Sequence, residues 1–193
     1  MADPFRLDGK VAIVTGASRG LGRAIALALA DAGADVAGAA RATAEIEETA
    51  HQVEQRGRPA LAVRTDVADY AQVEALVART TAGLGGLHIV VNNSGIAGVQ
   101  PVLDMPPEEF ARVIQVNLVG VFHGCRAPAA RLTGQKAGKV INMASVMAVA
   151  GPAAYTPYPA PKGGVIALTK CPAVEWARYN VQVNAIAPGW FVT

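Results

Sequence analysis

Residues 10–33, KVAIVTGASRGLGRAIALALADAG, decide the fold. They begin with 11–15, a run rich in β-branched residues that is typical of a strand buried on both faces. A turn containing Gly16, Gly20 and Gly22 follows, and apolar residues then recur at helical spacing. In a strand, glycine turn and helix of this kind, backbone N–H groups and a helix N-terminus face a pyrophosphate. The alternative is an ordinary turn with incidental glycines, but the strand and the helix on either side favour nucleotide binding.

The composition indicates one domain with a sizeable apolar core. Of the 193 residues, 52% are apolar and 17% are charged, against about 25% charged in an average protein. This suits a parallel sheet covered on both faces, or a subunit that buries surface in a homo-oligomer, a dimer or a tetramer. A net charge of +2 without a basic stripe argues against a nucleic-acid partner.

The sequence also argues against a membrane protein and a metalloprotein. No apolar run is long enough to cross a bilayer and no signal peptide is recognisable, so we expect a cytoplasmic protein with no membrane partner. The two cysteines, Cys125 and Cys171, are expected to be free thiols. The three histidines are far apart and lack neighbours at ligand spacing, so we expect no metal site.

Short apolar runs alternate with helical patterns along the whole chain. Strands are predicted at 11–15, 35–40, 60–65, 87–91, 139–143 and 181–186, and helices after the first at 43–57, 69–84, 108–132 and 158–179. This alternation predicts an α/β fold of the Rossmann type, a doubly wound parallel sheet in three α/β/α layers with strand order 3-2-1-4-5-6. Residues 1–7 are expected to form a loose lead.

Tyr158 and Lys162 are four residues apart at the start of a predicted helix, so both side chains lie on one face. A nearby cation favours a phenolate, and we therefore expect Lys162 to lower the pKa of Tyr158. Such a tyrosine acts as an acid and base near neutral pH. By itself, however, this spacing is more often found on a solvated helix face.

Ser145 and Asn117 are two further candidates. Ser145 follows the fifth strand and can bond a substrate oxygen, although most serines there are turn or cap residues. Asn117 lies in an apolar helical stretch, where an unpaired amide costs about 1–3 kcal/mol. It is either a satisfied core residue or the holder of a water that relays protons to Lys162.

Together these motifs resemble the short-chain dehydrogenase/reductase family over nearly the whole chain. Residues 15–22, TGASRGLG, match its T-G-x-x-x-G-x-G motif, and residues 92–95, NNSG, are similar to its N-N-A-G. The four catalytic positions match Asn117, Ser145, Tyr158 and Lys162. The cofactor-binding positions that the resemblance and the charge pattern indicate are Gly16, Ser18, Arg19, Gly20, Leu21, Gly22, Arg41, Asp66, Val67, Asn93, Ser94, Gly95, Tyr158, Lys162, Pro188, Gly189 and Thr193.

The resemblance implies hydride transfer between a nicotinamide cofactor and a carbonyl or secondary alcohol. In that scheme Tyr158 exchanges the hydroxyl proton, Lys162 lowers its pKa and binds the nicotinamide ribose, Ser145 orients the substrate oxygen and Asn117 supports a proton relay. Residues 175–180, EWARYN, look like those of keto-gluconate reductases, which act on a sugar acid, and 3-oxoacyl thioester reductases are the next candidates. The alternative is a non-catalytic NADP-binding module or an inactive fragment of the same fold.

The charge pattern favours NADP over NAD. An NAD site usually carries a carboxylate at the end of the second strand, where this chain has Ala39, Ala40 and Arg41. Arg19 lies in the glycine turn, and two guanidinium groups near the adenosine ribose favour a 2′-phosphate.

Three departures from the family pattern affect these expectations. Residues 1–193 form a single dinucleotide-binding and catalytic domain without the family's substrate loop, seventh strand and last helix, so we expect weaker cofactor binding and poor turnover. Pro159 and Pro161 bias the residues before them away from helical geometry, which makes the Tyr158–Lys162 arrangement less secure. Pro128 and Pro172 fall inside predicted helices and should each cost about 3 kcal/mol or kink the helix.

Overall fold

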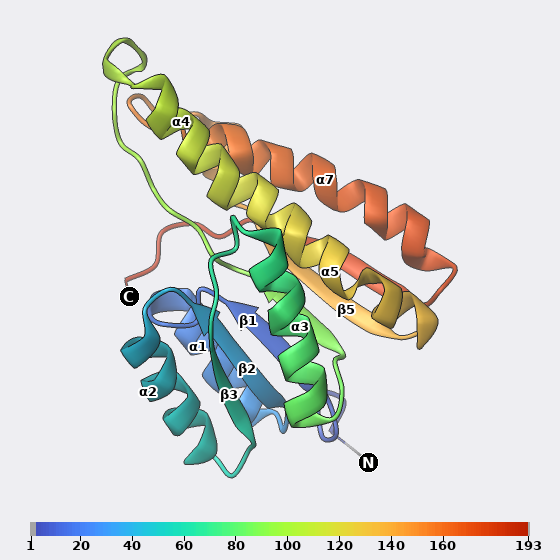
Figure 1. Ribbon diagram of the computed structural model, residues 1–193. Helices are drawn as coiled ribbons and strands as arrows, with labels where there is room; N and C mark the ends of the chain where they lie inside the picture. The colour runs from blue at the N-terminus through green and yellow to red at the C-terminus, as the bar shows by residue number, and fades with distance from the viewer. Residues whose placement is uncertain (1–2, 193) are drawn as a thin grey trace.

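The computed structural model describes residues 3–192 and has three layers, a central sheet between two layers of helices (Figure 1). All strand pairs are parallel, and the strand order is β3-β2-β1-β4-β5-β6, as the sequence predicts. The strands are β1 (Val11–Thr15), β2 (Asp35–Ala40), β3 (Ala60–Arg64), β4 (Ile89–Asn92), β5 (Gly138–Met143) and β6 (Val181–Ile186).

The order in which the chain adds strands to the sheet reverses between β1 and β4. This reversal divides the helices between the two faces of the sheet. One face carries α1 (Gly20–Asp31) and α2 (Thr43–Glu54), and the other carries α3 (Tyr70–Leu84), α5 (Gly120–Gly134) and α7 (Pro159–Ala177). The side chains of β1 show the division, because Ala12 and Val14 join the core under α1 and α2 while Ile13 joins the core on the opposite face. Every residue of β1 is buried, as expected for a strand covered on both sides.

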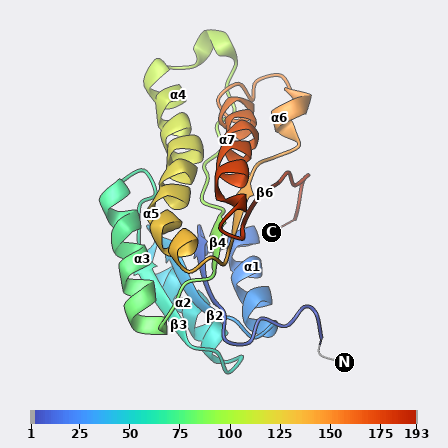
Figure 2. The same cartoon turned by 90° about the vertical axis from the view of Figure 1, so that its right-hand side faces the viewer.

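The predicted helix at 108–132 is interrupted by a wide turn. The π-helical turn η2 (Gln115–Val119) joins α4 (Pro107–Ile114) to α5, and the three elements follow one another beside α7 (Figure 2). Such turns are rare and often occur at functional sites. This one carries the fully buried Asn117. Two short elements were not expected, η1 (Val102–Asp104) and α6 (Met147–Ala150).

Both helices that contain an internal proline continue past it. Pro128 lies inside α5 and Pro172 inside α7, both rings are buried, and each helix continues beyond its proline. At the start of α7, Tyr158 precedes Pro159 but still has right-handed helical angles, φ −90° and ψ −47°. Pro159 and Pro161 fall in the first turn, where N–H groups have no partner within the helix. The prolines therefore leave Tyr158 and Lys162 on one helical turn.

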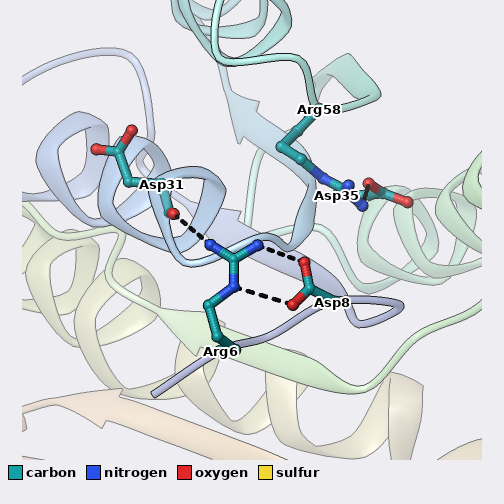
Figure 3. A network of polar contacts seen from close by, with 5 residues as sticks. All are labelled: Arg6, Asp8, Asp31, Asp35 and Arg58. Atoms are coloured by element: carbon teal, nitrogen blue, oxygen red, sulfur yellow. Dashed lines mark hydrogen bonds and ion pairs between the residues drawn. The ribbon is translucent and has the colours of Figure 1, made fainter. Parts of the chain in front are cut away.

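The end of the segment before β1 is joined to the body of the protein, so the expectation of a loose lead is wrong for Arg6 and Leu7. Leu7 N donates to Ala32 O at 2.7 Å, and the Arg6 guanidinium binds both carboxylate oxygens of Asp8. Arg6 also donates to Asp31 O at the end of α1, as Figure 3 shows. These contacts lie at the edge of the sheet where β1 begins, opposite the carboxyl ends of the strands.

We predict that Gly124 is required for the packing of α5 on β4. A Cβ at this position would overlap the side-chain amide of Asn92, whereas a Cβ on Gly134 of the same helix would meet no atom within 4 Å. Gly124→Ala should lower the free energy of unfolding by about 1–3 kcal/mol. Gly134→Ala should leave it unchanged or raise it by up to about 1 kcal/mol. Urea denaturation measures both, and equal effects of the two substitutions would contradict this packing.

Candidate active site

A cavity of about 440 Å³ opens at the carboxyl ends of β1 to β4. Four loops line it, each directly after a strand, so the walls come from segments that are far apart in the sequence. Its lining residues are Gly16, Ser18, Arg19, Leu21 and Gly22 after β1, Ala40, Arg41 and Ala42 after β2, Thr65, Asp66 and Val67 after β3, Asn93, Ser94, Gly95 and Ile96 after β4, and Glu45 and Val116 from helices.

The loops after β1 and β4 are joined by hydrogen bonds. Thr15 Oγ1 accepts from Asn93 N at 3.0 Å and from Ser94 N at 3.1 Å, and Asn93 Nδ2 also donates to Thr15 O at 3.0 Å. Gly16 has φ +69°, and a Cβ there would lie 2.9 Å from Asn93 Nδ2. A Cβ on Gly22 would overlap the Gly16 carbonyl. Glycine is therefore needed at both positions, because the two loops and the start of α1 approach each other so closely.

The first turn of α1 is suited to an anion. The helix has no side-chain cap hydrogen bond and no acidic residue in its first turn. The first N–H groups of a helix have no partner within it, and the helix dipole adds partial positive charge at that end. A dinucleotide pyrophosphate is the ligand that such a glycine turn and helix N-terminus accommodate, so the residues present fit this group.

The end of the cavity formed by the loops after β1 and β2 carries charges of both signs. Arg19 and Arg41 line it and are exposed, while β2 ends in Ala40, so the strand supplies no carboxylate. Glu45, in the first turn of α2, also lines the cavity and was missed by the sequence analysis. The signal was available, since the N-terminus of a helix that follows a parallel strand lies at the same edge as the cavity.

The remaining predicted cofactor residues lie outside the cavity lining. These are Gly20, Tyr158, Lys162, Pro188 and Gly189, and Thr193 lies outside the described residues. Pro188 nevertheless comes close to Ser145, because Val146 N donates to Pro188 O at 3.1 Å. The segment after β6 thus runs beside the segment after β5.

A second group of polar side chains surrounds the start of α7. Ser145 and Lys162 are buried, and Lys162 Nζ lies 5.6 Å from the centroid of the Tyr158 ring. Lys162 Nζ also donates to Met143 O at 2.5 Å. The predicted pair of phenol and ammonium is therefore present, with the ammonium directed to a carbonyl of β5.

The pKa values in this group are shifted mainly by burial. Burial lowers the pKa of Lys162 to about 8. Burial also raises the pKa of Tyr158, and hydrogen bonding by Ser145 lowers it by a smaller amount. The expectation that Lys162 lowers the pKa of Tyr158 is therefore wrong for this structure, because desolvation disfavours both charged forms.

Asn117 connects the two groups of residues. Its side-chain amide is paired on both sides, accepting from Ile96 N and donating to Ile96 O, each at 2.8 Å. Of the two interpretations of this side chain, the structure supports the satisfied core residue. Gly95, which lines the cavity, lies directly against this amide and Lys162, since its Cβ would be 3.3 Å from Asn117 Oδ1 and 3.8 Å from Lys162 Nζ. The cavity and the polar group at α7 therefore adjoin at Gly95.

Two kinds of feature are absent from residues 3–192. No cluster of three or more His, Cys, Asp or Glu side chains in this range could hold a metal ion. No helix in the same range is both long and apolar enough to span a membrane.

Comparisons with characterised proteins agree with the fold. The model of the short chain dehydrogenase family matches residues 10–193. The chain is 38% identical over 190 residues to 2-dehydro-3-deoxy-D-gluconate 5-dehydrogenase of Escherichia coli K12. The aligned residues make up 98% of this chain and 74% of that protein. It is also 38% identical over 185 residues to a 3-oxoacyl acyl-carrier-protein reductase of Staphylococcus aureus, covering 95% of this chain and 75% of the relative.

Solved structures give the same result. The gluconate 5-dehydrogenase of Burkholderia cenocepacia J2315, in complex with NADP and tartrate, superimposes with a TM-score of 0.93 at 38% identity, over 99% of this chain and 75% of that one. NAD⁺-bound xylitol dehydrogenase gives a TM-score of 0.94 at 35% identity, over 99% and 73% of the two chains. The motifs, the strand order and these matches show that this chain belongs to the short-chain dehydrogenase family of oxidoreductases.

Proposed function

We propose that this chain is an NADP-dependent oxidoreductase that interconverts a carbonyl and a secondary alcohol, with residues 1–193 as one dinucleotide-binding and catalytic domain. The observation that carries the proposal is the contact at Gly95 between the cavity and the polar group at the start of α7. When bound, the nicotinamide cofactor would supply or accept the hydride. The protein's own residues then have to position the reactants and move one proton.

Tyr158, Ser145 and Lys162 would carry out the proton transfer. Ser145 Oγ accepts from Met147 N at 3.2 Å, and its hydroxyl would orient the substrate oxygen beside Tyr158. Tyr158 would donate or accept the hydroxyl proton beside it. With a pKa of about 8, Lys162 is mostly protonated at neutral pH, and its ammonium would bind the nicotinamide ribose beside Tyr158.

Asn117 would act through its main chain, since its side-chain amide is occupied by Ile96. A π-helical turn changes the bonding pattern of the carbonyls around it, and Asn117 is the middle residue of such a turn. We infer that this backbone supports a proton relay through a water to Lys162. The relay would continue proton exchange with solvent after Tyr158 reacts.

The preference for NADP rests on the adenosine end of the cavity. Arg19 and Arg41 would hold a 2′-phosphate there, and no carboxylate at the end of β2 is present to bind free ribose hydroxyls. Glu45 limits the net positive charge but lies on α2, beyond the end of the strand. A gluconate 5-dehydrogenase of this fold binds NADP, while a xylitol dehydrogenase of this fold binds NAD⁺.

The substrate class is inferred from the relatives. One of them acts on a sugar acid and another on a 3-oxoacyl thioester, so a small molecule of one of these classes is the proposed substrate.

We further infer a homo-oligomer, a dimer or a tetramer, because Phe122 on α5 and Val174 on α7 expose apolar side chains. The two free thiols, Cys125 and Cys171, fit a cytoplasmic location.

We predict that Tyr158→Phe lowers kcat at least about 100-fold, because the proton donor is removed. The assay follows NADPH oxidation with a panel of keto acids, diketones and 3-oxoacyl thioesters. Tyr179→Phe, two residues beyond the end of α7, is the matched control and should retain activity. Tight NADPH binding by the wild type without turnover of any substrate would support the non-catalytic module instead.

We predict that Arg41→Ala weakens NADP binding about tenfold or more, because a charged hydrogen bond to a phosphate contributes about 1.5–3 kcal/mol. Affinity for NAD should not change. Arg79→Ala, which removes an exposed arginine from α3, controls for the loss of charge. Calorimetric titration with both cofactors measures the ratio, and a wild type that binds NAD as tightly as NADP would refute the proposed preference.

A further inference from the structure

A chain of three buried polar side chains crosses from the sheet to α7. Asn92 at the end of β4, Asn142 in β5 and Thr169 in α7 are 2%, 0% and 5% exposed. Their surroundings on this face are an apolar core that includes Val140 and Val165. Buried polar groups are costly unless they are paired, so an arrangement of this kind calls for a physical role.

The hydrogen bonds in this chain run from β4 through β5 to α7. Asn92 Nδ2 donates to Asn142 Oδ1 at 2.8 Å, and Asn142 Nδ2 donates to Thr169 Oγ1 at 3.0 Å. Thr169 Oγ1 donates in turn to Val165 O at 2.7 Å, within its own helix. The amide of Asn142 therefore bonds Asn92 in β4 and Thr169 in α7, and its Oδ1 also accepts from Cys125 Sγ in α5 at 3.6 Å. The hydroxyl of Thr169 accepts from the sheet and donates to the helix.

A second hydrogen bond between α7 and β5 lies two helical turns before Thr169, at Lys162. Lys162 precedes Thr169 by seven residues, so both lie on the same face of the helix, about 10 Å apart along its axis. Met143, the residue after Asn142, accepts the hydrogen bond of Lys162 Nζ. β5 therefore holds α7 by hydrogen bonds at two points, the side chain of Asn142 and the carbonyl of Met143.

The apolar contacts of α7 cannot define its position equally well. Hydrophobic burial is non-directional, and a small slide of one apolar surface over another changes it little. A hydrogen bond between Asn142 and Thr169 loses its geometry when the helix shifts by a fraction of an ångström. β5 leads directly into Ser145, and α7 begins with Tyr158 and Lys162. The register of α7 on β5 thus sets how these three residues face one another.

We propose that Asn142 and Thr169 are positioning residues that fix α7 on β5 and thereby hold Tyr158 and Lys162 opposite Ser145. Neither residue lines the cavity. The catalytic consequence rests on the proposed function, whereas the structural consequence, an ordered start of α7, does not depend on it.

The test compares Thr169→Val with two controls. Valine keeps the shape of threonine but leaves Asn142 Nδ2 without an acceptor, while Thr169→Ser keeps the hydroxyl. Thr80→Val in α3 removes another buried threonine whose hydroxyl bonds only the carbonyl four residues earlier, Leu76 O at 2.8 Å. Thr80→Val therefore reports the general cost of losing a buried helical hydroxyl.

Hydrogen exchange of residues 159–168, relative to residues 43–54 of α2, measures the order of the start of α7. Thr169→Val should raise the relative exchange rate about tenfold, while Thr169→Ser and Thr80→Val should stay within about twofold of the wild type. The proposal is overturned if Thr169→Val behaves like Thr80→Val, or if exchange rises equally in α2. This readout needs no turnover, so a wild type that reduces no carbonyl would contradict the proposed function and leave this test decisive.

Activity provides the second readout. Thr169→Val should lower kcat about tenfold or more, because small misplacements of catalytic groups have large effects on rate. The KM for the carbonyl substrate should change less than twofold. Affinity for adenosine 2′,5′-bisphosphate should not change, since no residue of α7 lines the cavity. A loss of bisphosphate affinity equal to the loss of kcat would mean general damage to the fold, and the proposal would be wrong.

Discussion

The rest of the site depends on the contact between the ends of β1 and β4. At this point the strand order reverses, so the loop after β1 and the loop after β4 lead away to opposite faces of the sheet. Asn93 joins these loops by donating two hydrogen bonds to Thr15, and the absence of side chains at Gly16 and Gly22 permits the close approach. The cavity exists because the loops are held together at their base and diverge above it.

The polar group at α7 illustrates a different constraint. Lys162 is an ammonium group buried with one hydrogen-bond acceptor, Met143 O, and burial lowers its pKa to about 8. A buried cation does not stabilise a fold, but a strongly shifted pKa beside a cavity is typical of a functional residue. The sheet provides the rigid support for this unfavourable placement, because β5 supplies the Met143 carbonyl and leads directly into Ser145.

The sequence predicts the fold and the neighbourhood of the site well, since both follow from local patterns. Apolar runs of strand length alternate with helical patterns, and the glycine turn and the Tyr158–Lys162 spacing need only local geometry. The acidity of Tyr158 was predicted wrongly, because it depends on how far tertiary packing excludes water from the ring and on which carbonyl binds the ammonium. The contact of Asn142 with Thr169 joins a strand to a helix across 27 positions, and no local pattern indicates it.

The central claim is that the glycine turn and the loop after β4 together form a dinucleotide site, and NADPH binding by Gly22→Ala tests it most directly. A fluorescence titration of NADPH compares this variant with the wild type and with Gly134→Ala, and circular dichroism checks that all three are folded. We expect Gly22→Ala to lose affinity about tenfold or more, because its Cβ would displace the Gly16 carbonyl and the Asn93 amide. A folded Gly22→Ala protein that binds NADPH as tightly as the wild type would contradict the account.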